Sequence, residues 1–143
     1  MARFSAEATI KAQPDQVFAY VSDMNRHGEW GGHDLEVKQT SAGAVAVGST
    51  FTSTAKAFGT QREAQTVTAF DPGKKFAFEA TGGLGLARHE FDLSAVDGGT
   101  KVTKSMELIK PSFLAKVMSM KIKSDQPKEL AHDLDRIKAK LEG

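Results

Sequence analysis

The sequence predicts a single α+β domain over residues 1–143, in which an antiparallel sheet of about seven strands precedes a long carboxy-terminal helix. Three observations lead to this prediction. The chain opens with alternating apolar and polar residues, continues through strand-like stretches separated by short turns, and closes with a helical apolar stripe. Strands joined by short turns pair antiparallel, whereas parallel strands need long crossovers. The pattern therefore favours an antiparallel meander.

Residues 3–12 form the first predicted strand, because apolar and polar side chains alternate there with the period of a strand that buries one face. A short helix is expected next. Pro14 stands where a first helical turn tolerates a missing N–H. Val17, Phe18 and Val21 follow it at three- and four-residue spacing. This spacing predicts a helix with one buried side.

The middle of the chain is predicted to be sheet, with turns at Asp71-Pro72-Gly73, Asp97-Gly98-Gly99 and Gly59-Thr60. Gly82-Gly83-Leu84-Gly85 precedes a strand and opens no helix, so we expect a hairpin loop there and not a phosphate-binding loop. The expected strands cover residues 34–39, 49–58, 61–70, 75–81, 87–94 and 101–109.

Residues from Pro111 onward are predicted to be helical. Four apolar residues recur there at spacings of four, three and four, and must pack against the rest of the domain: Leu130, Leu134, Ile137 and Leu141. Pro127 interrupts the helical pattern upstream of this stripe. Two arrangements remain open: a short helix followed by a main helix that starts near Asp125, or one helix kinked at the proline.

Composition narrows the range of functions. Hydrophobic residues make up 40% of the chain and charged residues 26%, which is ordinary for a globular domain with a core. The 19 basic and 18 acidic residues give a net charge of +1, so no overall field attracts a nucleic acid or another polyanion. The late lysines are expected to form a solvated helix face, because no exposed aromatic residues are interleaved with them: Lys110, Lys116, Lys121, Lys123 and Lys128.

The chain contains no cysteine, which excludes disulfides, thiolate metal sites and cysteine nucleophiles. The amino terminus lacks a basic start followed by an apolar core, and no apolar run reaches the roughly 18 residues of a membrane span. We therefore expect a cytoplasmic monomer or homodimer with no integral membrane association, no nucleic-acid partner and no cofactor.

Four groups of residues carry a resemblance that covers nearly the whole chain. They are Ile10, Ala12, Pro14, Val17, Phe18, Val21, Ser22, Asp23 and Trp30; Gly48 with residues 67–76; residues 98–103; and residues 133–138 with Leu141 and Glu142. On these residues the sequence resembles the START-like or Bet v 1-like superfamily (SRPBCC), and within it the polyketide cyclase/dehydrase and lipid-transport group. The resemblance implies a helix-grip fold, in which a curved sheet wraps around the carboxy-terminal helix. It also implies a cavity between them that binds lipids, polyketides, sterols or other small apolar molecules.

Counting with a period of two along the predicted strands nominates the side chains that face this cavity. Phenylalanines and flexible methionines suit a wall around an irregular apolar ligand, although the same residues at this spacing also make an ordinary core. The lone tryptophan either caps one end of the cavity or anchors its own helix. The candidate ligand-binding residues are Trp30, Phe51, Ser53, Phe76, Phe78, His89, Phe91, Lys104, Met106, Leu114 and Met118.

His89 is the candidate for chemistry, because it alternates in phase with Phe91 and so places an imidazole on the buried face. It is either a ligand partner or acid–base group, or a core histidine satisfied by a neighbouring strand. Lys104 either binds a carboxylate at the cavity mouth or extends outward into solvent. No histidine pair has the spacing of a metal site. The other histidines are expected in loops or on helix surfaces: His27, His33 and His132.

Three functions follow from these observations, in order of preference. The first is binding or transport of a small hydrophobic molecule. The second is an aromatase/cyclase-type enzyme acting on a bound polyketide, with His89 as the base and Ser53 and Lys104 polarising a carbonyl. The third is a protein-interaction module that uses the lysine-rich segment 116–128.

Overall fold

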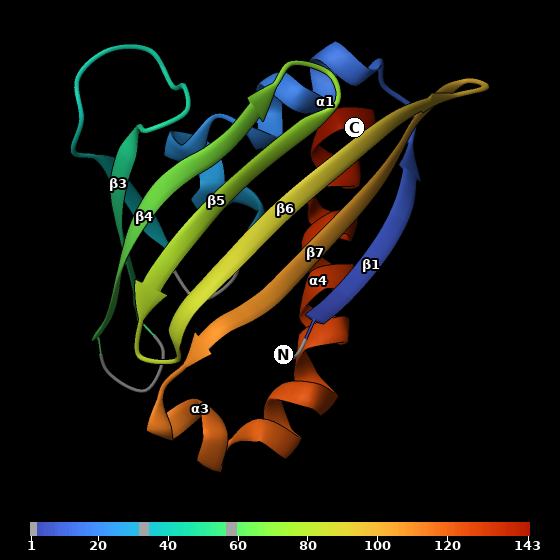
Figure 1. Cartoon of the computed structure of the whole chain (residues 1–143). Coiled ribbons are helices and arrows are strands. Elements are labelled where there is room, and N and C mark those ends of the chain that lie inside the picture. The colour runs from blue at the N-terminus through green and yellow to red at the C-terminus, as the bar shows by residue number, and fades with distance from the viewer. Residues whose placement is uncertain (1–2, 32–34, 57–59) are drawn as a thin grey trace.

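A seven-stranded antiparallel sheet curves around one long helix in the computed structural model, which describes residues 3–31, 35–56 and 60–143 (Figure 1). The predicted α+β class and terminal helix are confirmed. The elements are β1 (Arg3–Ile10), α1 (Pro14–Val21), the 3₁₀ turn η1 (Met24–Arg26), α2 (His27–Trp30), β2 (Glu36–Gln39), β3 (Thr50–Lys56), β4 (Thr60–Asp71), β5 (Lys75–Gly82), β6 (Gly85–Val96), β7 (Gly99–Pro111), α3 (Phe113–Val117) and α4 (Ser119–Glu142).

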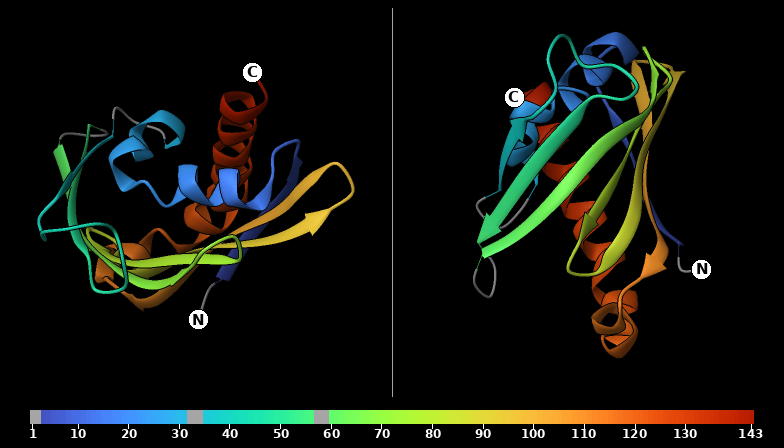
Figure 2. Two further views of the ribbon diagram at one scale, coloured as in Figure 1. Left: turned by 90° about the horizontal axis from the view of Figure 1, so that it is seen from above. Right: turned by 60° about the vertical axis from the view of Figure 1, so that its left-hand side comes forward.

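The strand order in the sheet is β1-β7-β6-β5-β4-β3-β2, and every neighbouring pair is antiparallel. Strands β2 to β7 therefore form a meander of hairpins, and the amino-terminal strand β1 is added beside the last one. Figure 2 shows the sheet bent so that its concave side holds α1, α2 and α4. The predicted meander and curvature are both present.

Burial follows the predicted period of two. In β1, exposed residues alternate with partly buried ones as far as the fully buried Ile10. Of the side chains expected to face inward from β3 to β7, His89 alone is only partly buried in the described sheet. The others are buried: Phe51, Ser53, Phe76, Phe78, Ala80, Ala87, Phe91, Leu93, Val102, Met106 and Leu108.

Several boundaries differ from the expected ones. Strand β2 begins at Glu36, and Asp34, where the prediction began, lies outside the described residues. The predicted turn at Gly59-Thr60 is corrected in part, because Thr60 already pairs with Lys56 in the sheet, while Gly59 is not described. Strands β6 and β7 extend beyond the predicted ranges because continuous pairing carries them to both ends of their hairpin.

Gly85 closes the hairpin between β5 and β6. The predicted hairpin loop is confirmed, since Gly82 pairs with Gly85 and leaves Gly83 and Leu84 as a two-residue turn. Gly85 has a φ of 100°, which favours glycine. A Cβ atom at this position would clash with the carbonyl oxygen of Lys110. The glycine thus allows β6 to approach the end of β7.

The carboxy-terminal region contains a short helix followed by one long helix. The break lies at Met118, so the main helix starts at Ser119 and not near Asp125 as one prediction had it. Pro127 lies inside α4. Proline has no N–H, so one carbonyl of the preceding turn loses its helical hydrogen bond. Pro127 is exposed, and solvent can hydrate that carbonyl. None of the helices in the described part of the chain is long and apolar enough to cross a membrane.

Two apolar clusters make up the core. The larger one joins α1, α2, the sheet and the far half of α4, and includes Trp30, Phe91 and Leu134. The smaller one lies toward α3 and includes Met106 and Ile122. Because α4 contributes to both clusters, the helix is fixed along most of its length against the concave side of the sheet.

Replacing Leu134 by alanine tests this packing. Leu134 is 1% exposed, and its truncation should lower the free energy of unfolding by about 3 kcal/mol, since it leaves a cavity between α4 and the sheet. Urea denaturation followed by circular dichroism measures the change. Val47→Ala, at an apolar side chain that is 63% exposed, is the control and should change stability by less than about 0.5 kcal/mol.

Candidate functional site

A cavity of about 200 Å³ lies between the sheet and α4. Strands β3 to β7 form one wall, α2 forms one end and α4 forms the other wall. Its apolar surface comes from Leu35, Ala55, Phe78 and Leu130. Polar side chains supply the rest of the lining, so the cavity is more polar than the sequence predicts: His27, Glu63, Gln65, His89, Lys104 and Asp133, with Gln126 and Glu129 on α4.

Lys104 is the central charge of this cavity. Its side chain is only 4% exposed, and its ammonium lies 3.1 Å from the Oδ2 atom of Asp133 on α4. The same ammonium lies 5.4 Å from the ring centre of Trp30 and 5.5 Å from that of Phe91, close enough for cation–π attraction. The sequence left open a lysine that extends outward into solvent, and the burial of Lys104 excludes that alternative. Asp133 provides the carboxylate partner that a buried ammonium needs.

Asp133 extends this ion pair to α2. Its Oδ1 atom accepts a hydrogen bond of 3.0 Å from Nη1 of Arg136, and the same Nη1 donates to the carbonyl oxygen of Trp30 at 3.0 Å. Three elements are thereby joined at the cavity: β7 through Lys104, α4 through Asp133 and Arg136, and α2 through Trp30.

His27 forms the end of the cavity. Its ring stacks on Trp30 with a centroid distance of 4.1 Å, and the residue is only 9% exposed. The prediction that His27 lies on the surface is wrong, because α2 packs its inner side against the sheet. Burial, reinforced by the charge of Lys104, lowers the pKa of His27 to about 3, so the imidazole is uncharged near neutral pH.

His89 reaches the cavity from β6, on the face that the alternation predicted. Its ring stacks on Phe78 at 4.9 Å and is nearly parallel to it, with 17° between the planes. Burial is the main cause that lowers the pKa of His89 well below its usual value, followed by the charge of Lys104 and, when His27 is protonated, by the charge of that imidazole. This imidazole is also uncharged at neutral pH, and it is a weak base.

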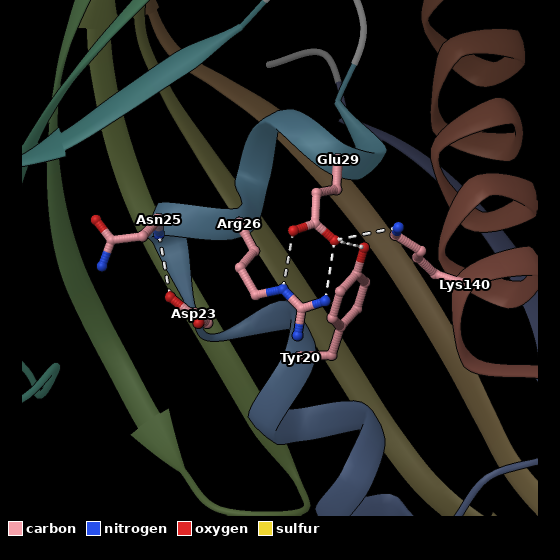
Figure 3. Close-up of polar contacts among 6 residues, drawn as sticks. All are labelled: Tyr20, Asp23, Asn25, Arg26, Glu29 and Lys140. Carbon is pink, nitrogen blue, oxygen red and sulfur yellow. Dashed lines mark hydrogen bonds and ion pairs between the residues drawn. The ribbon is translucent and has the colours of Figure 1, made fainter.

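A polar cluster centred on Glu29 joins α2 to α1 and α4 (Figure 3). Glu29 accepts hydrogen bonds of 2.9 and 3.0 Å from Arg26 and one of 3.2 Å from the hydroxyl of Tyr20. Lys140 of α4 lies 3.8 Å from the same carboxylate. The hydrogen bond from Arg26 is the main cause that lowers the pKa of Glu29. Burial, followed by the charge of Glu29, raises the pKa of Tyr20 to about 12.

Two buried polar atoms of the cavity wall have no hydrogen-bond partner among the described residues. They are Nδ1 of His27 and Oε1 of Gln65, whose residue is only 2% exposed. Buried polar groups are nearly always paired with protein, water or ligand. Burial also raises the pKa of Glu63, which lines the cavity beside Gln65. Two lining residues thus carry hydrogen-bonding capacity that the described protein groups leave unused.

A second cavity of about 190 Å³ adjoins the first, since Ala55 and Glu63 line both. Its other lining residues lead toward α3 and the hairpin between β5 and β6: Ser53, Arg62, Gly83, Leu84 and Leu114. Each cavity alone is smaller than the roughly 300 Å³ expected for a drug-sized ligand. A longer molecule would have to occupy both.

The candidate ligand-binding residues from the sequence divide into three groups. Phe78, His89 and Lys104 line the first cavity, and Ser53 and Leu114 line the second. Trp30, Phe51, Phe76 and Phe91 belong to the larger apolar cluster, while Met106 is buried in the smaller one and Met118 packs against it. The side chains nominated from the strands therefore include both cavity residues and core.

Sequence reasoning missed several lining residues, notably His27, Gln65 and Asp133. One signal was present for His27, because Val17, Val21, Met24 and His27 continue one three- to four-residue spacing past the end of α1. A signal was also present for Gln65, which alternates in phase with Val67, and for Asp133, which lies three residues after Leu130 and four before Ile137. His132, predicted on the helix surface, is exposed there, and His33 lies outside the described residues.

Two features of the cavity bear on the hypothesis of an enzyme. In the described part of the chain, no group of three or more histidine, aspartate or glutamate side chains is placed to hold a metal ion. A general base works best when its pKa lies near the working pH, and the lowered pKa of His89 removes it from that range. His89 is therefore a weak base in this fold, which disfavours its assignment as the catalytic base.

A curved antiparallel sheet wrapped around a terminal helix defines the Bet v 1-like class of proteins. A family model described as polyketide cyclase / dehydrase and lipid transport matches residues 1–142. The chain belongs to this family, and the resemblance found in the sequence is confirmed. No match was found among curated proteins.

Solved structures agree with this class. A protein from Chromobacterium violaceum has a TM-score of 0.78 at 14% identity, over 100% of this chain and 99% of the other. Ara h 8.0201 has a TM-score of 0.64 at 19% identity, covering 95% and 97%. The Aha1 dimer from Colwellia psychrerythraea has a TM-score of 0.68 at 20% identity, covering 99% and 96%. At these identities the likeness concerns the fold alone.

Breaking the buried ion pair should destabilise the fold. Asp133→Asn leaves the ammonium of Lys104 buried without its carboxylate, and should lower the free energy of unfolding by about 3 kcal/mol. Asp125→Asn is the matched control on the same helix, because its pair with Lys121 is solvent-exposed and worth less than about 1 kcal/mol. Equal losses in urea denaturation would contradict a special role for Lys104 and Asp133.

Stability should fall on acidification because of the buried imidazoles. Between pH 6.5 and 4 the unfolded chain takes up a proton at His27, while the folded chain, with a pKa of about 3, does not. The free energy of unfolding therefore decreases as pH falls through this window, by about 1.4 kcal/mol per pH unit for a fully effective group. His27→Gln should flatten this dependence in urea titrations at several pH values. An unchanged slope would contradict the burial of a neutral His27.

Proposed function

We propose that the protein binds a small amphiphilic molecule whose polar end is uncharged, with that end in the cavity between the sheet and α4. The observation that carries the proposal is the pair of buried, unpartnered polar atoms in the cavity wall, Nδ1 of His27 and Oε1 of Gln65. A ligand that hydrogen-bonds to them would restore the pairing that buried groups require.

The charges of the cavity support an uncharged polar end. The single lysine of the described lining is already paired with Asp133, and both histidines have pKa values that keep them neutral. Glu63 and Glu129 add acidic groups to the same wall. A carboxylate placed there would lose its hydration without gaining a free cation, which is strongly unfavourable. An amide, alcohol or phenol would meet no such penalty.

The apolar end of the ligand would extend into the adjoining cavity. Leu84, Leu114 and Ala55 supply apolar surface there, and the shared residues Ala55 and Glu63 make the two spaces neighbours. Ser53, Arg62 and Glu63 also line this second cavity, so the arrangement suits an amphiphile whose more polar end lies in the first cavity. It agrees with a family described by polyketide and lipid ligands, and it requires no catalytic group.

Matched ligand pairs test the proposal. Isothermal titration calorimetry should show that a primary amide such as 3-phenylpropanamide binds at least about tenfold more tightly than the corresponding carboxylate, because only the carboxylate must bury a charge. Gln65→Leu should weaken amide binding about fivefold or more, since it removes the buried acceptor. Gln39→Leu, on β2 and outside the lining of both cavities, is the control and should bind normally.

Two outcomes would count against this function. Equal or tighter binding of the carboxylate would show that the site carries a usable positive charge. No heat of binding from amides, alcohols or phenols of increasing chain length would show that the cavities hold no ligand of this class.

A further inference from the structure

Four apolar side chains are exposed together at the junction of α3 and α4. Phe113 is 82% exposed, Leu114 50%, Val117 66% and Met120 85%. We call these residues the α3 patch. Figure 1 shows α3 projecting from the end of the molecule at which the β5–β6 hairpin turns. Clustered exposure of large apolar side chains is unusual on a soluble surface and marks a site of contact.

The α3 patch is not a poorly packed piece of core. The opposite side of the same segment is already seated, since Ala115 is 2% exposed and Ile122 6% exposed, and both belong to the smaller apolar cluster. The hydroxyl oxygen of Ser112 accepts a hydrogen bond from the amide of Ala115, and the same hydroxyl donates to the carbonyl of Gly83. The helix is thus held by its inner side, and the α3 patch is the outer side of a fixed element.

Lysines flank the α3 patch along the chain. Residues 110–128 contain five lysines and one acidic residue, whereas the whole chain has 19 basic and 18 acidic residues. That acid, Asp125, is paired with Lys121. All five lysines are exposed: Lys110, Lys116, Lys121, Lys123 and Lys128. The expectation of a purely solvated lysine face rested on the lack of an exposed aromatic, and the exposed Phe113 contradicts that reason.

We propose that the α3 patch docks on an anionic lipid surface. Exposed apolar side chains that enter the boundary between headgroups and acyl chains, flanked by lysines that meet anionic headgroups, are what a peripheral membrane site requires. The local excess of positive charge provides the complementarity to such a surface. A neutral apolar protein groove would have no use for the five lysines.

The position of the α3 patch connects docking to the cavities. Leu114 belongs to the patch and also lines the second cavity, together with Gly83 and Leu84 of the neighbouring hairpin. Docking through α3 would therefore bring the lining of that cavity next to the lipid surface. An amphiphile could then pass between the membrane and the protein with little exposure of its apolar end to water.

Vesicle co-sedimentation tests the docking without any cavity ligand. The full chain should bind vesicles of 70% phosphatidylcholine and 30% phosphatidylglycerol, should bind pure phosphatidylcholine much more weakly, and should be released by about 0.5 M NaCl. Phe113→Ser should reduce the partition coefficient about tenfold. Val47→Ser, at an exposed apolar side chain in the loop before β3, is the matched control and should bind like the wild type.

Charge variants complete the test. Lys116→Gln combined with Lys123→Gln should lower the partition coefficient by about fivefold for each lysine removed. Lys38→Gln combined with Lys74→Gln removes the same charge from β2 and from the β4–β5 turn, and should have little effect. All these side chains are exposed, so circular dichroism should show unchanged folds.

Three results would overturn the proposal. The first is no binding to anionic vesicles at low salt. The second is equal binding by the wild type, Phe113→Ser and the lysine variant. The third is a wild-type dimer in sedimentation equilibrium that Phe113→Ser converts to a monomer while vesicles bind neither, because the α3 patch would then join two copies. Since no ligand enters the assay, each result is independent of the function proposed for the cavity.

Discussion

The buried ion pair between Lys104 and Asp133 is the constraint on which the interior of this protein depends. It links the sheet to α4 at 3.1 Å, in a place where an unpaired ammonium would not be tolerated. Asp133 can pair with Lys104 only at one position of α4 along its axis relative to β7. The ion pair therefore sets the register of the helix on the sheet. Arg136 transmits the same register to α2 through the carbonyl of Trp30.

The same ion pair determines the electrostatic character of the cavity. Burial, assisted by the charge of Lys104, keeps the two enclosed imidazoles neutral, and the carboxylate of Asp133 leaves the lysine with little attraction for a second anion. A space that the fold alone would make apolar is thereby converted into one with several hydrogen-bonding groups and little free charge. The family fold provides the architecture, and a few polar side chains set the polarity of the cavity.

The sequence was sufficient for the architecture and for the inward faces of the strands, because alternation and helical spacing are local properties. It predicted that Phe78, His89 and Lys104 share one side of the sheet, and they do. It could not predict the partner of Lys104, because the pairing depends on how α4 crosses the sheet. The prediction for His27 failed because its spacing signal runs from α1 across the 3₁₀ turn η1 into the separate four-residue α2, and a helical spacing is not expected to persist across such a break.

The edge position of β1 has a consequence for how the chain folds. This strand pairs with β7 alone, with Phe4 opposite Met106, so its partner is made about a hundred residues later. Strands β3 to β7 are joined by short hairpins and can assemble from local contacts. Strand β1 can pair only after the chain closes a loop that spans most of the sequence. On the ribosome the first strand would emerge without a partner until nearly the whole domain has been synthesised. Folding of this domain is therefore expected to be slow at its last step, with the two ends of the chain joining after the hairpins have formed.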